Sequence, residues 1–276
     1  MAITAADVKK LRTATGAGMM DCKKALQEAD GDLEKAIEII RKKGMAIANK
    51  RADREASEGV VLSKVSDDNK KGAIISLNCE TDFVAKNEGF VEFATKILNV
   101  ALEQQPADLE ELKGLELEGG RTVETHVSEQ TGIIGEKLEL GFYDKIEAPY
   151  CISYIHAGNK LATLVGFNKE NIDQQMAKDV AMQVAAMSPA GIDKDDVPEE
   201  VVNKELEIAK EKYRLEGKPE NMLDKIAQGN LNKFYKENTL LNQAFVKDSK
   251  INIKQYLETA DKDLTVTVMK RFSLNN

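Results

Sequence analysis

The first 44 residues place apolar side chains at helical spacing between helix-capping residues. Thr4 and Asp7 form a capping-box pair, and Ile3 and Val8 stand where a hydrophobic staple would close the first turn. A helix is therefore expected to begin at Ala5, as the first of three helices in a small N-terminal domain.

The third of these helices has its own start and end signals. Asp32 caps its start, and Arg41, Lys42 and Lys43 before Gly44 combine cations at a helix C-terminus with a glycine suited to the left-handed cap. We expect this helix to end at Gly44 and a polar, basic linker to follow it.

A different pattern follows the linker. Residues 60–65 and 73–77 are rich in β-branched side chains and flank a turn at Asp67-Asp68-Asn69, which predicts a β-hairpin. Helical segments through residues 90–101, 109–112 and 123–127 and a strand at residues 137–146 complete the unit.

The same order of elements returns roughly 90 residues later. The second set consists of strands at residues 150–156 and 161–167, a helix through Met176, Val180 and Val184, a short helix at residues 253–257 and a strand at residues 264–269. We therefore predict an α+β fold with a duplicated β-β-α-α-β core and antiparallel sheets.

A charged helical pair interrupts the second half. Val202, Leu206, Ala209 and Tyr213 follow 4-3-4 spacing, and the tight turn Gly217-Lys218-Pro219 precedes another helical pattern. This predicts an inserted antiparallel coiled-coil hairpin.

The chain is accordingly divided into four parts. These are an N-terminal domain with its basic linker at residues 1–54, a first core subdomain at 55–147, a second core subdomain at 148–188 and 241–276, and the inserted hairpin at 189–240.

Composition narrows the functional classes. The 276 residues are 42% apolar with only 5 prolines, as in a folded protein, and 39 basic against 47 acidic residues give a net charge of −8. The negative charge disfavours general nucleic-acid binding. The chain has no apolar run of membrane-spanning length and no secretory signal pattern, so a cytoplasmic protein with no membrane partner is expected.

The chain contains too few cysteines and histidines, too widely spaced, to predict a disulfide framework or a zinc site. Cys22, Cys79 and Cys151 are widely spaced, which favours buried free thiols over a disulfide or metal site. His126 and His156 are the only histidines and do not form a zinc motif, so no metal is expected.

Enzyme motifs are incomplete. Residues 16–21 begin like a dinucleotide-binding loop but lack the third glycine, and residues 114–121 lack the lysine and hydroxyl of a phosphate loop and are expected to form an ordinary loop. We therefore expect no enzymatic activity, no cofactor and no direct nucleotide binding.

One basic cluster has two interpretations. Six cations between Arg41 and Arg54 surround Asp53 and give a local charge of +5. They either end a helix and solvate a linker, or they form the contact surface of an RNA-associated scaffold.

Phe83 breaks the local pattern, because it is an aromatic residue in the polar turn Asn78–Asn87. A phenylalanine in a turn either packs on its own domain or is offered outward. The residues alone leave both possibilities open.

The segments Thr13–Leu26 and Asn78–Ala85 closely resemble the signature pair of the elongation factor Ts family. The order of N-terminal helices, duplicated core and inserted hairpin also corresponds, and the resemblance implies a UBA-like N-terminal domain. It further implies a nucleotide exchange factor that releases GDP from elongation factor Tu without chemistry of its own. In the family pattern, Thr81, Asp82, Phe83 and Val84 enter the GTPase domain and displace its magnesium.

The resemblance implies a second contact surface on the N-terminal domain, near the phosphate loop of the GTPase. Its residues would be Leu11, Arg12, Met19, Met20 and Lys23. From the residues alone, Met19 and Met20 could equally form a core pair.

Weaker contacts are implied for Ile134, Gly135 and His156, and a satisfied histidine at a strand end is the alternative for His156. Lys247 stands where an apolar contact residue can occur. Many members continue into a C-terminal helix after the segment that here reads Ser273–Asn276, so contacts from such a helix are not expected. A homodimer and a heterotetramer with elongation factor Tu are both compatible with the hairpin.

Overall fold

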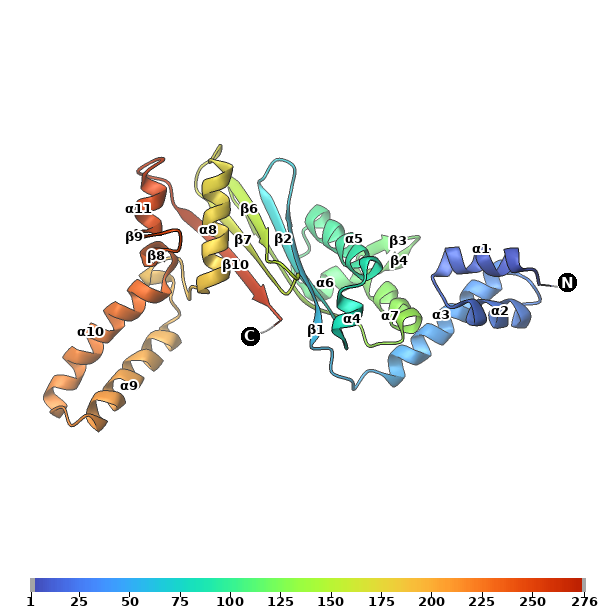
Figure 1. The fold of residues 1–276 in the computed structure, drawn as a ribbon, viewed down its shortest axis with the longest axis horizontal. Helices are drawn as coiled ribbons and strands as arrows, with labels where there is room; N and C mark the ends of the chain where they lie inside the picture. The colour runs from blue at the N-terminus through green and yellow to red at the C-terminus, as the bar shows by residue number, and fades with distance from the viewer. Residues whose placement is uncertain (1–2, 275–276) are drawn as a thin grey trace.

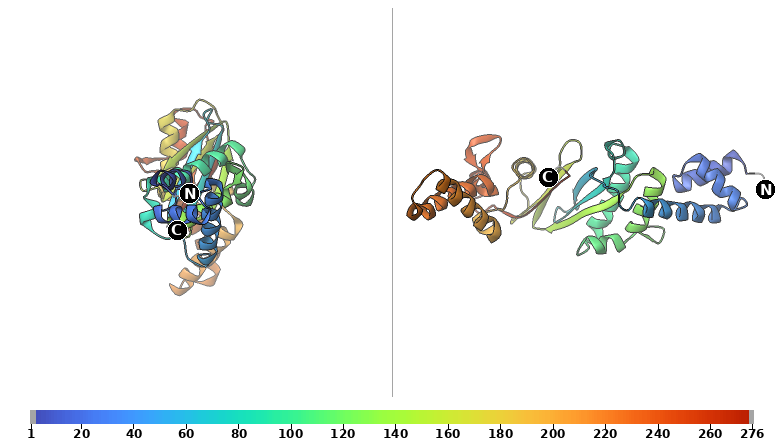
Figure 2. Two further views of the ribbon diagram at one scale, coloured as in Figure 1. Left: turned by 90° about the vertical axis from the view of Figure 1, so that its right-hand side faces the viewer. Right: turned by 90° about the horizontal axis from the view of Figure 1, so that it is seen from below.

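The computed structural model describes residues 3–274 and shows a mixed α/β fold with antiparallel sheets (Figure 1). The N-terminal helices lie at one end, the main sheets in the middle and a helical hairpin at the other end. A view from below shows the same elongated arrangement (Figure 2).

The N-terminal module consists of α1 (Ala5–Thr15), α2 (Met19–Glu28) and α3 (Leu33–Lys50). The capping box is confirmed: the Thr4 hydroxyl accepts a hydrogen bond from the Asp7 N–H, and the Asp7 carboxylate accepts one from the Thr4 N–H. The apolar faces of the helices meet in a core of Leu11, Ala17, Cys22, Ala25, Leu26, Ala29, Ala36 and Ile40.

The first sheet contains β1 (Glu58–Val65), β2 (Lys71–Cys79) and β5 (Glu139–Glu147). The strands are antiparallel in the order β1-β2-β5, so the predicted hairpin is confirmed. One face of this sheet is buried against the helices of the same unit, with Phe90, Ile97 and other α5 residues in the core.

These helices are α4 (Asp82–Ala85), α5 (Glu88–Gln104), α6 (Leu109–Gly114) and α7 (Val123–Ile134). The last of them continues well past the end predicted at Val127. The loop expected at residues 114–121 is wrong, because β3 (Glu116–Glu118) and β4 (Arg121–Thr122) form a small hairpin there.

The second sheet contains β6 (Tyr150–Ile155), β7 (Leu161–Phe167) and β10 (Val266–Ser273) in the order β6-β7-β10. The predicted repeat is confirmed at the level of strand order, since each half is a hairpin joined by a later strand that pairs with its second strand. The remaining elements of this half are α8 (Gln174–Met187), β8 (Ala244–Phe245), β9 (Asp248–Asn252) and α11 (Ile253–Glu258).

The two sheets pack on each other through their free faces. Buried residues between them include Val61, Ile74 and Leu164. Phe142 and Phe272 stack with ring centroids 4.1 Å apart, which joins β5 to β10. The two halves of the core therefore share a buried interface.

The end predicted for α3 is wrong. α3 continues through Gly44 to Lys50, because Gly44 packs against Gly132 of α7 and does not cap the helix. The cations before Gly44 also have tertiary partners: Arg41 pairs with Glu129. The linker therefore begins only after Lys50.

The inserted hairpin consists of α9 (Glu199–Leu215) and α10 (Glu220–Asn238), flanked by the short 3₁₀ helices η1 (Lys194–Asp196) and η2 (Leu240–Asn242). It projects away from the sheets (Figure 1). At its base the Leu240 N–H donates to the Gly191 carbonyl at 2.9 Å, so the segments that enter and leave it are joined.

Cys22, Cys79 and Cys151 are free and buried, as predicted. Among residues 3–274, no helix combines the length and apolarity needed to cross a bilayer. Within this described range, no group of three or more His, Cys, Asp or Glu side chains is arranged to hold a metal ion.

Candidate functional site

The side chain of Phe83 points into solvent. It lies in α4 and is 83% exposed, the most exposed of the large apolar residues in the described part of the chain. The polar turn expected around it is the first turn of a short helix, whose N-cap is Thr81. Val84 and Ala85 face the core on the other side of the helix, so α4 is anchored by these two residues while the ring points to solvent.

The α4 tip, residues 81–86, is held by a carboxylate from a distant segment. Glu136 accepts hydrogen bonds from the Thr81 N–H at 3.0 Å and from the Thr81 hydroxyl at 2.7 Å. Glu80 in turn accepts one from the Lys137 N–H at 2.6 Å. Each segment therefore supplies a carboxylate that accepts hydrogen bonds from the other.

Ile134 and Gly135 lie immediately before this tie. Ile134 packs against the core cluster that also contains Ala85 of α4, and Gly135 ends α7 in the left-handed conformation at φ 80°. The glycine allows the chain to turn so that Glu136 reaches Thr81. The structure thus brings these two predicted residues close to the α4 tip.

Charges around Phe83 are locally paired. Lys86 and Asp82 form an ion pair at 2.6 Å, and the hydrogen bond from Lys86 is the largest cause that keeps the pKa of Asp82 below its ordinary value. Burial, together with the Glu136 carboxylate, raises the pKa of Cys79 to about 12. The Cys79 thiol therefore stays protonated, and it donates to the Thr81 carbonyl at 3.2 Å.

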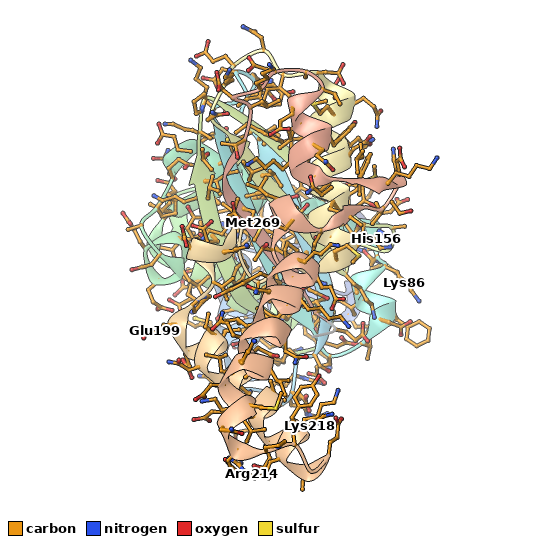
Figure 3. All side chains as sticks on the ribbon, turned by 90° about the vertical axis from the view of Figure 1, so that its left-hand side faces the viewer. Lys86, His156, Glu199, Arg214, Lys218 and Met269 are labelled. Atoms are coloured by element: carbon orange, nitrogen blue, oxygen red, sulfur yellow. The ribbon has the colours of Figure 1, made fainter. Side chains whose placement is uncertain are left out.

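His156 is exposed on the β6–β7 turn, and its Nδ1 lies 2.9 Å from the Tyr154 hydroxyl. The same turn reaches the first sheet, because Lys160 pairs with Glu58 at 2.7 Å. Lys160 also contributes to the lowered pKa of Asp82. In Figure 3, His156 and Lys86 project on the same side of the molecule, so the turn borders the face that carries the α4 tip.

A second exposed surface lies on the N-terminal module. Met19 and Met20 are 63% and 64% exposed at the start of α2, so the core-pair interpretation is wrong. Arg12 and Lys23 are exposed as well. Leu11 is fully buried on the face of α1 that packs on α2 and α3, so the structure does not bring its side chain to this exposed surface.

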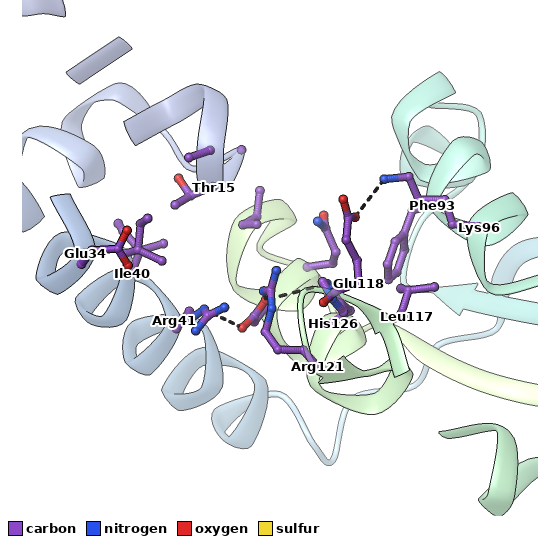
Figure 4. Close-up of a pocket in the computed structure, with 16 residues that line it drawn as sticks. Thr15, Glu34, Ile40, Arg41, Phe93, Lys96, Leu117, Glu118, Arg121 and His126 are labelled. Carbon is purple, nitrogen blue, oxygen red and sulfur yellow. Dashed lines mark hydrogen bonds and ion pairs between the residues drawn. The ribbon is translucent and has the colours of Figure 1, made fainter. Parts of the chain in front are cut away.

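A cavity of about 430 Å³ separates part of the N-terminal module from the core (Figure 4). Several of its charged side chains pair with one another: Arg41 and Arg121 both contact Glu129. Lys96 pairs with Glu118 at 3.2 Å. Most of the charge that lines the cavity is therefore paired within the protein, although the buried Arg121 Nε has no hydrogen-bond partner among residues 3–274.

Comparison with known proteins assigns the chain to a family. A family model described as "Elongation factor TS" matches residues 80–276. The chain belongs to the elongation factor Ts family. Its members are named for translation elongation, a step of protein biosynthesis.

The similarity covers the whole chain. Elongation factor Ts of Porphyromonas gingivalis is 56% identical over 275 residues, covering 100% of this chain and 99% of the relative. The Christiangramia forsetii protein is 53% identical over 274 residues, with 99% and 98% covered. That of Aquifex aeolicus is 44% identical over 285 residues, again with 99% and 98% covered.

Several structural residues of this elongation factor Ts family member were not predicted as functional. Glu80 and Glu136 hold the α4 tip, and Gly44 and Gly132 form the crossing of α3 and α7. The position of Glu80 inside the signature segment Asn78–Ala85 was the one feature of the sequence that could have pointed to its role. The partners of the other three lie far away in the sequence and become visible only in the fold.

The structure explains the lysine at position 247. Lys247 pairs at 2.7 Å with Asp179, which is only 5% exposed. Burial would raise the pKa of Asp179, but hydrogen bonds from Lys247, Gln175 and Tyr256 outweigh it, and the pKa lies below the ordinary value. Lys247 therefore neutralises a buried carboxylate.

The basic cluster is largely neutralised in the fold. Arg51 and Arg54 pair with Glu80 at 2.7 and 3.6 Å, and Lys43 pairs with Asp21. Cations held by carboxylates are less available to phosphates. This arrangement argues against an RNA-associated scaffold.

Proposed function

We propose that this protein is a guanine nucleotide exchange factor for elongation factor Tu. It binds the GDP-bound GTPase, displaces the magnesium ion and releases GDP so that GTP can bind during elongation. The protein itself performs no reaction, holds no cofactor and does not contact the nucleotide. Membership of the elongation factor Ts family supports this role.

The observation that carries the proposal is the exposed ring of Phe83 on a firmly held tip. An isolated phenylalanine that is 83% exposed contributes almost nothing to the protein's own fold. Thr81, Asp82, Phe83 and Val84 are proposed to enter the GTPase domain, with the ring as the wedge. Since a GTPase binds its nucleotide through loop amides, a lysine and magnesium, disturbing the metal weakens one of these supports directly.

Phe83 is not sufficient by itself. Loosening a nucleotide a thousandfold requires about 4 kcal/mol of differential binding, whereas burial of one phenylalanine supplies roughly 1.5 to 3 kcal/mol. The exposed surface of Met19, Met20, Arg12 and Lys23 is proposed to supply the rest on the same domain. By linkage, GDP must weaken binding of the exchange factor as much as the factor weakens GDP.

Ile134, Gly135 and His156 are proposed as secondary contacts, because Ile134 and Gly135 lie next to the segment that holds the α4 tip and His156 projects on the same side of the molecule. The N-terminal module is proposed to be UBA-like and, with the linker, to form a domain of residues 1–54. The core subdomains are placed at 55–147 and at 148–188 with 241–276, and the coiled-coil hairpin at 189–240. We propose that the protein acts in the cytoplasm with elongation factor Tu as its partner. The hairpin is compatible with a homodimer and with a heterotetramer that includes elongation factor Tu.

The test is release of fluorescent GDP from preloaded elongation factor Tu of a related bacterium. Micromolar amounts of this protein should accelerate release strongly in the presence of excess unlabelled GDP. Omission of magnesium from the buffer should raise the basal rate and shrink the stimulation. An unchanged release rate with folded protein would exclude the proposed function.

A further inference from the structure

α3 links the two proposed contact surfaces. It is 18 residues long, roughly 27 Å at 1.5 Å per residue. Its first half packs on α1 and on α2, and α2 carries Met19 and Met20. Its second half crosses α7 and ends beside Glu80, the residue directly before the α4 tip.

The crossing of α3 and α7 leaves no room for a side chain at Gly132. A Cβ there would lie 2.1 Å from the Cα of Gly44, a distance that requires backbone movement. Glycine usually costs about 1 kcal/mol against alanine inside a helix, so the close approach opposes local helix preference. The contact therefore fixes how closely the two helices pack.

Charged contacts secure α3 on both sides of this crossing. Arg41 pairs at 3.2 Å with Glu129, whose side chain is 12% exposed. Arg51 pairs at 2.7 Å with Glu80, whose side chain is 13% exposed. Glu80 also holds the Lys137 N–H, next to the Glu136 that clamps Thr81.

The cavity in Figure 4 lies between the N-terminal module and the core. It separates Thr15 and Ile37 of the module from Phe93 and Leu117 of the core. The helix crossing consequently has to bear most of the connection between the two parts.

We propose that Gly132 and Glu80 are positioning residues that keep the N-terminal module and Phe83 in one fixed relation, so that both surfaces engage a single GTPase at the same time. This inference rests on the proposed function and deepens it. Two surfaces on one rigid body bind with a gain in affinity that is lost when their geometry prevents simultaneous contact. This role requires no contact of either residue with the partner.

The decisive variant is Gly132→Ala, compared with Gly229→Ala. Both place a methyl group inside a helix, but nothing lies within 4 Å of a Cβ at Gly229 in α10. GDP release from elongation factor Tu is followed over a range of exchange-factor concentrations. Spin labels at Glu28→Cys and Glu103→Cys, both exposed positions, report the distance between module and core, because the three native cysteines are buried.

For Gly132→Ala we expect a shifted or broadened label distance and a rise of roughly tenfold or more in the half-saturating concentration. Gly229→Ala should match the unmodified chain in both measurements. In a chain that already carries Phe83→Ala, adding Gly132→Ala should change release less than about twofold, because one surface alone needs no alignment. A merely structural defect would multiply with the Phe83 loss.

Arg51→Gln keeps the proposal testable if Gly132→Ala does not fold. It removes the second charged contact and should raise the half-saturating concentration by up to about fivefold with an unchanged melting temperature. An unaltered label distance, an unaltered half-saturating concentration or a full multiplicative loss with Phe83→Ala would overturn the positioning role. If the unmodified chain and Gly229→Ala fail to stimulate release, the proposed function itself is wrong.

Discussion

Replacing Phe83 with alanine should separate function from stability. The ring is 83% exposed, so its removal takes almost no buried apolar area from the free protein. In the complex, full burial of a phenylalanine is worth roughly 1.5 to 3 kcal/mol, which corresponds to about a 10- to 150-fold loss in stimulated GDP release. The melting temperature should stay within about a degree of the unmodified protein, since surface changes rarely matter to stability.

Two other alanine variants calibrate this result. Leu215 at the end of α9 is 80% exposed, so Leu215→Ala tests whether loss of any exposed apolar side chain reduces exchange. Phe90 is 2% exposed, and Phe90→Ala should cost about 3 to 5 kcal/mol of unfolding free energy. Both release kinetics and thermal melts are recorded for all three proteins.

The expected pattern is slow release only for Phe83→Ala, a low melting temperature only for Phe90→Ala and no change for Leu215→Ala. A marked loss of melting temperature in Phe83→Ala with normal exchange would show that the ring packs inward in solution. Equal loss of exchange in Leu215→Ala would refute the special role of the α4 tip.

Three further predictions concern the supports around these surfaces. Glu136→Gln should leave the fold intact but slow GDP release severalfold, since a neutral amide holds the N-cap of α4 less tightly than a carboxylate does; release at the unmodified rate would contradict this. Joint replacement of Met19 and Met20 by alanine should raise the half-saturating concentration in the release assay without lowering the melting temperature, and a destabilised protein would place these side chains in the core. Lys247→Met should reduce the unfolding free energy at pH 7 by about 1.5 to 3 kcal/mol, because it leaves the buried Asp179 carboxylate without its cation. The lowered pKa of Asp179 contributes stability that is present above the pKa of the unfolded state and is lost as the pH falls through the pKa of the folded state. Lys247→Met should therefore move this loss of stability to higher pH when unfolding free energies are measured by urea titration. An unshifted pH profile would exclude a stabilising ion pair between Lys247 and Asp179.

The local patterns of the chain predicted most of the core. Strand-forming segments on either side of a turn predicted both hairpins, and the capping residues Thr4 and Asp32 marked helix starts that the structure confirms. The repeated order of elements also gave the matching order of strands in the two sheets. These features depend on neighbouring residues, so a sequence contains them directly.

Tertiary contacts decided the features that the sequence did not reveal. Gly44 has the local appearance of a helix end, but its contact with Gly132 allows α3 to continue. Leu11 is one of the residues that the resemblance implies for the contact surface of the N-terminal domain, yet the packing of α1 buries it. The direction of Phe83 depends on Val84 and on the other core residues that anchor α4.

The joined base of the helical hairpin has a consequence for how this family diverges. Ala190 donates to the Asn238 carbonyl at 2.8 Å, and Leu240 donates to Gly191, so the inserted segment leaves and re-enters the core at neighbouring points. The entropic free-energy cost of closing a loop rises by only about 0.6 kcal/mol for each doubling of the loop length. Evolution can therefore lengthen, shorten or delete the projection while β7 and β10 keep their pairing, and relatives should differ more in the size of this arm than in the sheets that carry it.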